Sequence, residues 1–421
     1  MTRVVVVDNI GALATMDGTG PHGLGLVHGA VVVCRDGLIE HAGPGRWAEL
    51  GGAAKAGDPA DQQDVVVVDA AGGAVVPGLI DCHTHALFLG DRCDEFARRA
   101  RGESYAQIAA AGGGIRSTMR AVRAASVDEL VAATRPRLQA MLARGVTTVE
   151  IKSGYGLSVD DELKMLRAIQ ALQRALSGTM HLEPTLLAAH AVPPEEASSS
   201  SWIDRIISEL LPIVAAEKLA TACDVFVEQG AFSVDDARRL LRAADQRGLA
   251  TRVHAEQLSW QGGARLAAEV SALSAGHLEH VTDDDAKALA DAGVVCEVLS
   301  LAQVFLKGQR AIPSRTLRDA GCVVAVATDL NPGTAMSTDL PLAAGLAVTQ
   351  CGLFAEEALH AITTGGARAL GLRDRGVIAV GKRADLLVLS VPDPLALTYR
   401  WSEALTRAVV VDGRIAVNPT A

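Results

Sequence analysis

The sequence predicts an α/β protein: a (β/α)8 TIM barrel with a small composite β-sandwich domain formed by the N- and C-terminal flanks. Three observations carry this prediction. Through the middle of the chain, short apolar strands alternate with longer helical stretches, which is typical of parallel βα units. Eight such strands can be counted, the number that closes this kind of barrel. Both ends of the chain instead show short β patterns separated by turn residues.

The N-terminal flank contains four short β patterns, at residues 4–7, 29–35, 37–42 and 65–68. A polar loop is expected at residues 51–64. After residue 370 the chain returns to β character at residues 376–389 and 408–411. We therefore expect residues 1–73 and 376–421 to form the composite β domain, and residues 74–375 to form the barrel.

The eight barrel strands are expected where buried-looking apolar runs occur between helical patterns. They are residues 74–81, 146–152, 181–188, 224–228, 250–254, 272–278, 294–298 and 322–328. Four of the helices between them are expected at residues 159–176, 202–218, 234–247 and 283–292. The run of serines at residues 198–201 is expected to be a loop.

The composition indicates a globular protein without a nucleic-acid partner. With 421 residues, 49% hydrophobic and 21% charged, the chain can bury a large core. Its net charge is −10 and it has no Lys/Arg-rich run, which argues against a nucleic-acid partner.

The cysteine pattern and the hydropathy indicate the compartment. The seven cysteines are scattered and form no Cys-x-x-Cys pair, which favours reduced thiols and a cytoplasmic location. No apolar stretch reaches the ~20 residues that a membrane span requires, and the first apolar run, four valines, is too short for a signal peptide.

The run Val76-Pro-Gly-Leu-Ile-Asp-Cys-His83-Thr-His85 ends the first expected barrel strand. Side chains two residues apart on a strand point the same way, so His83 and His85 can bind one metal ion together. A lone pair of this kind is more often two surface histidines beside a turn. Further ligands downstream are what favour the metal.

Such ligands follow from the barrel itself, because working residues lie at the carboxyl ends of its strands. His190, His254, His277 and Asp329 all fall at or just after expected strand ends. The other histidines are expected to be structural or solvated: His22, His28, His41, His360, and His181, which opens the third strand at the far end of the barrel.

Each residue taken alone has a simpler explanation. His254 is readily a hydrogen-bonded core histidine, and Asp329 an Asx-turn residue before Pro332. Together, His83, His85, His254 and Asp329 predict one metal site, for zinc or iron, between which the sequence does not discriminate.

A metal ion held in this way lowers the pKa of bound water from about 15.7 to ~7. Asp329 and His277 are the candidates for proton transfer. Glu256, two residues past His254, is expected on the same strand face if the strand persists, either supporting a ligand or serving a structural role.

This pattern resembles the amidohydrolase superfamily from about residue 70 to the C-terminus. The resemblance rests on Pro77-Gly-Leu-Ile-Asp-x-His-x-His85, on the histidines and aspartate after later strands, and on Gly381-Lys-Arg-Ala-Asp-Leu386. Binuclear members carry a bridging lysine or acidic residue on strand four. Residues 223–228 contain no lysine, so the resemblance implies a single ion.

Further motifs resemble one group in that superfamily, the cyclic amidases of histidine degradation. They are Gly112-Gly-Gly-Ile115, Glu150-Ile-Lys-Ser-Gly-Tyr-Gly-Leu157, Ala188-Ala-His-Ala-Val-Pro193, His254-Ala-Glu-Gln-Leu258 and Thr328-Asp-Leu-Asn-Pro-Gly-Thr334. The resemblance implies hydrolysis of 4-imidazolone-5-propanoate to N-formimidoyl-L-glutamate. Gly276 and His280 depart from the group's pattern, leaving open which imidazole works; spacing from His254 favours His277.

The substrate would then be a small anionic imidazolone. Arg92 offers the planar fork that suits its carboxylate, unless it is a solvated charge at a helix start. Tyr155 and His190 would add donors, and Tyr105 lies in a matching segment, although both tyrosines also suit ordinary packing. The resemblance implies that Gln257 and Thr334 bind the ring, and that Asn331 and Gly333 meet the opened product.

Two other functions remain open. A cytosine- or guanine-type deaminase would share the metal ligands and release ammonia, and a barrel scaffold without catalysis would bind no metal. No membrane partner is expected, and a homodimer is left open.

Overall fold

The computed structural model describes residues 3–19, 23–50, 64–103, 107–108, 111–308 and 310–418. Three expectations lie outside these ranges: nearly all of the polar loop at 51–64, His22 and Tyr105.

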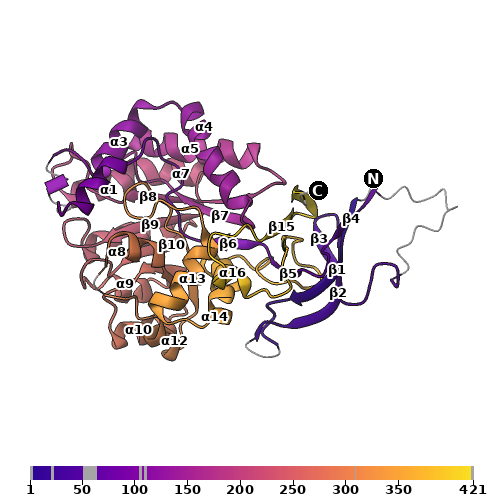
Figure 1. The fold of residues 1–421 in the computed structure, drawn as a ribbon. Coiled ribbons are helices and arrows are strands. Elements are labelled where there is room, and N and C mark those ends of the chain that lie inside the picture. The colour runs from indigo at the N-terminus through magenta and orange to yellow at the C-terminus, as the bar shows by residue number, and fades with distance from the viewer. Residues whose placement is uncertain are drawn as a thin grey trace.

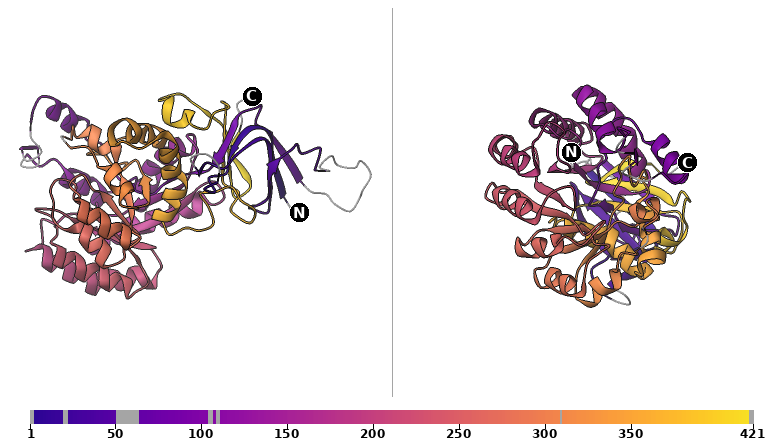
Figure 2. Two further views of the ribbon diagram at one scale, coloured as in Figure 1. Left: turned by 90° about the horizontal axis from the view of Figure 1, so that it is seen from below. Right: turned by 90° about the vertical axis from the view of Figure 1, so that its left-hand side faces the viewer.

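Eight parallel strands form the barrel and follow one another in chain order around it, as the sequence predicts. Figure 2 shows helices arranged around these strands. The strands are β6 (Leu79–Asp81), β7 (Val146–Lys152), β8 (His181–Ala189), β9 (Ala222–Val227), β10 (Ala250–Ala255), β11 (Ser274–His277), β12 (Val295–Val298) and β13 (Val324–Val326).

The barrel closes between its first and last strands through side-chain and loop contacts. Asp81 accepts hydrogen bonds from the Thr328 amide (3.1 Å) and from the Thr328 hydroxyl (2.6 Å). Beyond the strand ends, a parallel bridge joins Thr84 to Leu330. These contacts bring the segments after β6 and β13 together at the carboxyl end of the barrel.

The helices begin where serine and threonine side chains cap them, at Ser126, Ser158, Ser233 and Thr282. Before the eighth strand they are α1 (Cys93–Ala100), α3 (Ile115–Ala124), α4 (Val127–Leu142), α5 (Val159–Ala175), α6 (Ser199–Arg205), α7 (Leu211–Ala216), α8 (Val234–Asp245), α9 (Gly263–Glu269), α10 (Asp283–Asp291), α11 (Ser300–Phe305) and α12 (Ser314–Asp319). After it come α13 (Leu340–Cys351), α14 (Ala355–His360), α15 (Gly366–Ala369) and α16 (Ala396–Tyr399).

The serine run expected to be a loop is instead a helix start. The Ser198 hydroxyl accepts a hydrogen bond from the Ser201 amide, so α6 begins three residues before the expected helix at 202. A π-helical turn, Ile206–Leu210, then joins α6 to α7. A second π-helical turn, Ala361–Gly365, joins α14 to α15.

The two flanks form a second sheet beside the amino-terminal end of the barrel (Figure 1). Its order is β16-β15-β14-β5-β1-β2-β3, and β4 pairs with β1. Val5, Val32, Val75, Leu386 and Val410 share one buried core, so the N- and C-terminal parts pack together. The strands are β1 (Arg3–Ala14), β2 (Leu26–Arg35), β3 (Leu38–Pro44), β4 (Asp64–Asp69), β5 (Ala74–Pro77), β14 (Leu386–Leu389), β15 (Thr406–Val411) and β16 (Arg414–Val417).

The single strand expected at residues 74–81 is divided at Gly78. Its first part, β5, pairs in the flank sheet, and its second part, β6, opens the barrel. A Cβ atom on Gly78 would lie 2.3 Å from the Thr147 hydroxyl, so only glycine fits at this junction. The domain boundaries at residues 73 and 376 stay a prediction. Within the described ranges, no helix is both long and apolar enough to cross a membrane.

Trp202 tests how strongly the helical layer holds the barrel. Its side chain is fully buried and donates a hydrogen bond to the Ala188 carbonyl at 2.9 Å. We expect Trp202→Ala to lower the free energy of unfolding by about 3–5 kcal/mol, through lost burial and an empty cavity. Thermal unfolding followed by circular dichroism measures the effect.

Tyr399→Ala is the control, because that side chain is 82% exposed. It should change stability by less than about 0.5 kcal/mol. Equal destabilisation by both substitutions would contradict the packing described above.

Candidate metal centre

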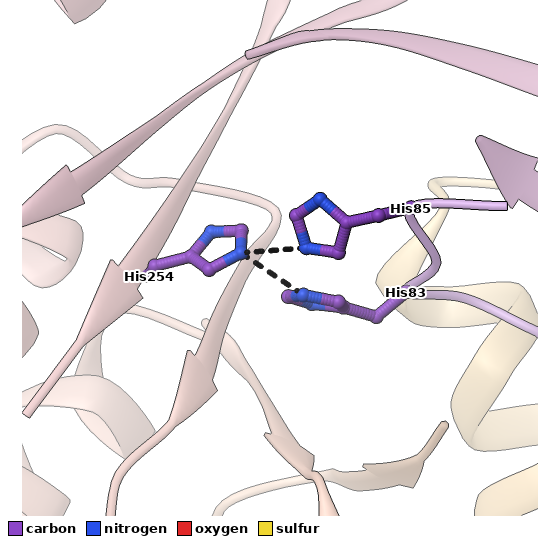
Figure 3. A group of neighbouring side chains, drawn as sticks. All are labelled: His83, His85 and His254. Carbon is purple, nitrogen blue, oxygen red and sulfur yellow. Dashed lines mark hydrogen bonds between the residues drawn. The ribbon is translucent and has the colours of Figure 1, made fainter. Parts of the chain in front are cut away.

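Three imidazole rings converge at the carboxyl end of the barrel (Figure 3). His83 and His85 follow β6, and His254 lies in β10. The Nε2 atom of His254 is 3.1 Å from Nε2 of His83 and 3.4 Å from Nε2 of His85. The three residues are 1–3% exposed.

Asp329 joins the three histidines from the segment after β13. Its Oδ1 atom lies 3.4 Å from Nε2 of His85 and 3.7 Å from Nε2 of His83. A tetrahedral ion with ligands at about 2.0–2.1 Å requires ligand atoms about 3.3 Å apart. The three imidazoles therefore fit an ion of the zinc or iron size, and Asp329 lies beside two of them as a further donor; imidazole and carboxylate ligands suit both metals.

The protonation of the histidines also fits a metal. Burial holds the pKa values of His83 and His85 well below their usual range, so both rings are neutral at pH 7. The Nδ1 atom of His83 lies 2.6 Å from Glu297 and therefore carries the proton, which leaves a lone pair on Nε2. Burial also raises the pKa of Asp329 to about 7, although the charges of His277 and Lys152 act in the opposite direction.

A second layer of charged residues orients two of the ligands. Glu297 holds His83, and Arg252 lies 3.3 Å from the other Glu297 oxygen. Asp224 lies 3.0 Å from Nδ1 of His254 and 2.9 Å from the Lys152 ammonium. Each supporting carboxylate therefore has its own buried cation.

Lys152 is fully buried, and its ammonium also contacts Glu150 at 2.9 Å. Burial alone would lower the pKa of Lys152, but Asp224 and Glu150 outweigh burial and raise it above its usual range. Likewise, burial opposes ionisation of Asp224, but His254 and Lys152 hold its pKa well below its usual range. Both groups therefore stay charged inside the barrel.

Sequence reasoning assigned no role to these supporting residues. Glu150, Lys152, Asp224, Arg252 and Glu297 all lie in barrel strands. The sequence did contain a signal for them. Each is a charged residue within a short buried strand, and a charge buried in this way requires a partner.

His277 ends β11, with its ring 5.4 Å from that of His254 and 5.8 Å from that of His83. Burial lowers the pKa of His277, but Glu279, 3.8 Å from its Nδ1 atom, and Asp329 outweigh burial and raise it. His280 follows in the turn, half-buried, and has no ring contact with the described site histidines. The structure thus brings His277 to the site.

Left-handed backbone occurs at three of these strand ends. His277 has φ of 76°, Leu278 of 68°, Glu256 of 56° and Asp329 of 53°, in the left-handed region that such residues rarely adopt. Strain of this kind persists only where surrounding contacts enforce it, and it gathers at functional sites.

Gly276 departs from the group's sequence pattern for a steric reason. A Cβ atom there would lie 3.0 Å from His83 Cε1 and 3.1 Å from Glu297 Oε2. Glycine at this position therefore leaves room for the contact between Glu297 and His83 that orients the His83 ring.

Glu256 would share a strand face with His254 only if the strand persisted, and it does not. Strand β10 ends at Ala255, and the left-handed backbone of Glu256 turns its side chain elsewhere. Its carboxylate accepts hydrogen bonds from the amides of Gln261 (2.6 Å) and Ala264 (3.0 Å). Its role is structural, at the start of α9.

Arg92 is not the solvated helix-start charge that was its alternative. It is 8% exposed, and two of its nitrogens donate to the Thr118 hydroxyl at 3.0 and 2.8 Å. Within the described part of the chain, Arg92 forms no ion pair with a carboxylate. A Cβ atom on Gly333 would lie 2.3 Å from Arg92 Nη1, so this glycine lets the guanidinium reach its place.

His190 and Tyr155 line the same mouth. The His190 ring stacks on that of His85, with centroids 4.9 Å apart, and the Tyr155 ring lies 5.4 Å from that of His190. Burial lowers the pKa of His190 to about 3, so the ring is neutral. Its Nδ1 atom donates to the Gly154 carbonyl at 3.0 Å, so Nε2 offers an acceptor, and the expectation that His190 adds a donor is wrong.

Asn331 organises the loop that follows Asp329. Its amide nitrogen donates to the Asp329 carbonyl and to the Thr334 hydroxyl, both at 2.7 Å. Its oxygen accepts from the amides of Gly333 (2.8 Å) and Thr334 (2.7 Å). Asn331 therefore occupies the turn position that had been the alternative role for Asp329.

Gln257 lies half-buried just past β10.

The site and fold together define a barrel hydrolase with a metal centre, and comparison with known proteins supports this class. The model of the Amidohydrolase family matches residues 89–417, so the chain belongs to the amidohydrolase family. Within it, the chain groups with the imidazolonepropionases. It is 46% identical to imidazolonepropionase from Anaeromyxobacter sp. (strain K), covering 98% of this chain and 96% of that one. It is 48% identical to that of Sphingopyxis alaskensis, covering 92% of each.

Solved structures show the same fold at lower identity. An adenosine deaminase from Xanthomonas campestris with bound zinc matches with a TM-score of 0.71 at 19% identity, covering 99% of this chain and 93% of that one. A triazine hydrolase variant matches with a TM-score of 0.70 at 17% identity, covering 99% and 95%.

Glu297→Gln tests the support of His83. The substitution keeps the size of the side chain but removes the charge that faces Nδ1 of His83. We expect metal affinity to fall about 10–100-fold, the usual effect of losing such a partner. Competition with a fluorescent chelator measures the affinity.

Glu183→Gln is the matched control, because Glu183 lies near the opposite end of the barrel, two residues into β8. Unchanged affinity in Glu297→Gln, or an equal loss in both variants, would contradict the proposed support.

Proposed function

We propose that the chain hydrolyses the cyclic amide C–N bond of 4-imidazolone-5-propanoate and releases N-formimidoyl-L-glutamate. The printed name of its relatives supports this reaction. The observation that carries the choice of substrate is Arg92, a buried guanidinium with no carboxylate partner among the described residues. A buried cation of this kind is costly unless a ligand pairs with it, and a propionate supplies that charge.

The proposed cofactor is one zinc or iron ion per chain, bound by His83, His85, His254 and Asp329. When bound, such an ion lowers the pKa of water and withdraws electrons from a carbonyl group. The three neutral imidazoles and the carboxylate leave the ion a net positive charge for this purpose.

The residues around the ion position the substrate. Arg92 binds the propionate through its planar fork. The lone pair on Nε2 of His190 accepts a hydrogen bond from a ring N–H group. Tyr155 packs beside His190. As the resemblance implies, we further propose that Gln257 and Thr334 contact the ring, that Tyr105 contacts the substrate, and that Asn331 and Gly333 meet the opened product.

Hydrolysis requires two proton movements. Water adds to the ring carbonyl, the C–N bond breaks, and the departing nitrogen takes up a proton. Asp329 is placed to accept the proton from water and to pass it to that nitrogen. His277, whose pKa is raised, is placed as an imidazolium to donate a hydrogen bond to the carbonyl oxygen as it becomes negative. His277 and Asp329 are thus the proposed catalytic residues.

Two finer points also stay proposals. The seven cysteines are all free thiols, which supports the proposed cytoplasmic location. A homodimer remains proposed, and light scattering of the purified chain would test it.

The reaction is tested with purified protein and 4-imidazolone-5-propanoate. We expect the ring absorbance to disappear and N-formimidoyl-L-glutamate to form, without release of ammonia. Removing the metal with a chelator should abolish turnover, because the proposed mechanism depends on the ion to lower the pKa of water. Adding zinc or iron back should restore it.

Full turnover by metal-free protein would contradict the mechanism. Release of ammonia from cytosine or guanine, with no action on the imidazolone, would show a deaminase instead. Protein that binds no metal and turns over none of these compounds would favour a scaffold.

Arg92→Gln tests substrate recognition. Losing a charged pair of hydrogen bonds costs about 3 kcal/mol, which lowers kcat/KM by about 100-fold. The methyl ester of the substrate, which lacks the charge, should lose little. Steady-state kinetics measure kcat/KM for the acid and for the ester. The parent chain should prefer the acid, and this preference should disappear in the variant.

Arg98→Gln is the matched control, because Arg98 pairs with Glu103 at the surface of α1. It should keep the preference for the acid. A retained preference in Arg92→Gln would assign the carboxylate to another residue.

A further inference from the structure

A second group of potential metal ligands lies at the opposite end of the barrel. His181 is the first residue of β8, Asp385 directly precedes β14, and Asp412 lies in the turn between β15 and β16. Nε2 of His181 is 3.5 Å from Oδ2 of Asp385 and 3.4 Å from Oδ2 of Asp412. The group thus joins the barrel to the flank sheet, and the reaction proposed above uses none of it.

Two atoms of this group are buried without a hydrogen bond. Oδ2 of Asp385, a residue only 5% exposed, accepts none from the described residues, and Nε2 of His181 forms none. Leaving a buried polar atom unsatisfied costs about 1–3 kcal/mol, and more for a charged one. Both atoms face the same point, so a cation between them would satisfy both.

The nearby arginines do not fill this place. Arg383 is directed at Asp374 and at Oδ1 of Asp412, whereas His181 lies near the other oxygen of Asp412, Oδ2. Arg375 binds Asp374 and the Thr148 hydroxyl. Its Nη1 atom lies 3.9 Å from Oδ2 of Asp385, beyond hydrogen-bond reach.

The local charge also leaves room for a cation. The carboxylates of Asp374, Asp385 and Asp412 face the two guanidiniums of Arg375 and Arg383, which leaves one net negative charge when His181 is neutral. Two converging carboxylate oxygens repel each other unless a positive charge lies between them.

We propose that His181, Asp385 and Asp412 bind a second divalent ion, of the zinc class, at the junction of the barrel and the flank sheet. The spacing of 3.4–3.5 Å is close to the spacing of about 3.3 Å that tetrahedral zinc requires. An imidazole among the ligands favours zinc over calcium or magnesium, which prefer oxygen alone.

The role of this ion is structural. Its ligands come from three segments that are adjacent only in the folded chain, so the ion binds the native state and stabilises it. It lies at the end of the barrel away from the catalytic ligands, so its loss should leave turnover unchanged.

The experiment uses the full chain with its catalytic site loaded, dialysed against buffered zinc. Bound metal is then counted by atomic emission. We expect two zinc ions per chain in the parent protein and one in His181→Gln and in Asp412→Asn. A hundredfold excess of zinc over the dissociation constant of the second ion should raise the thermal midpoint of the parent chain by about 3 °C. It should not raise that of either variant.

His28→Gln is the matched control, because His28 lies in β2, away from both sites. It should keep two zinc ions, and kcat/KM should change less than twofold in all three variants. Asp412→Asn alters a surface turn, so it keeps the test valid if His181→Gln folds poorly.

A single zinc ion in the parent chain would overturn the proposal, as would a second ion that both variants retain.

Discussion

At the mouth of the barrel, Nε2 of His254 lies within 3.4 Å of Nε2 of His83 and His85, and Asp329 lies within 3.7 Å of those two rings, all of them buried away from water. Lone pairs at this spacing repel one another unless a cation lies among them. The charged residues around the site hold the ligands in place against that repulsion. Glu297 and Asp224 fix the rings of His83 and His254, and Arg252 and Lys152 balance those two carboxylates. The barrel interior is thus an ordered charge network as well as an apolar core.

The same contacts close the barrel and place the ligands. The Asp329 amide donates to the His83 carbonyl at 3.0 Å, and the His85 amide donates to the Leu330 carbonyl at 2.9 Å. Closure of β6 against β13 therefore sets the distance between the paired histidines and the aspartate. The left-handed backbone at His277 and Asp329 is the local cost of this arrangement, and it is held by the surrounding contacts.

The sequence predicted the barrel strands well where an apolar run ended in turn residues. Strand β7 matches its expected bounds, and β8 and β10 each extend one residue further. Residues 74–81 were predicted as one strand. The apolar pattern is continuous there and does not reveal that its first part joins one sheet and its second part another. Of residues 376–389, only the last four form a strand, and β16 was not predicted, since short edge strands carry little pattern.

The site was predictable in part for a similar reason. A strand end identifies which residues face the mouth, so His83, His85, His254, His277 and Asp329 were found together. Pairings across the barrel, such as Lys152 with Asp224, depend on which strands become neighbours, and a single sequence does not state this. The role of Glu256 was left open because it depended on where the strand ends, and the strand ends directly before it.

The pairing of β5 with β14 has a consequence for how the chain is made. Val76 pairs with Leu387, so one partner leaves the ribosome first and the other only after the entire barrel has been synthesised. During that time β6–β13 can pair with their neighbours in order, while β5 presents an open edge. An open edge of this kind promotes association between nascent chains. The flank sheet is therefore the last part of the molecule to be completed. Nascent chains are most prone to associate with one another while the edge of β5 is unpaired.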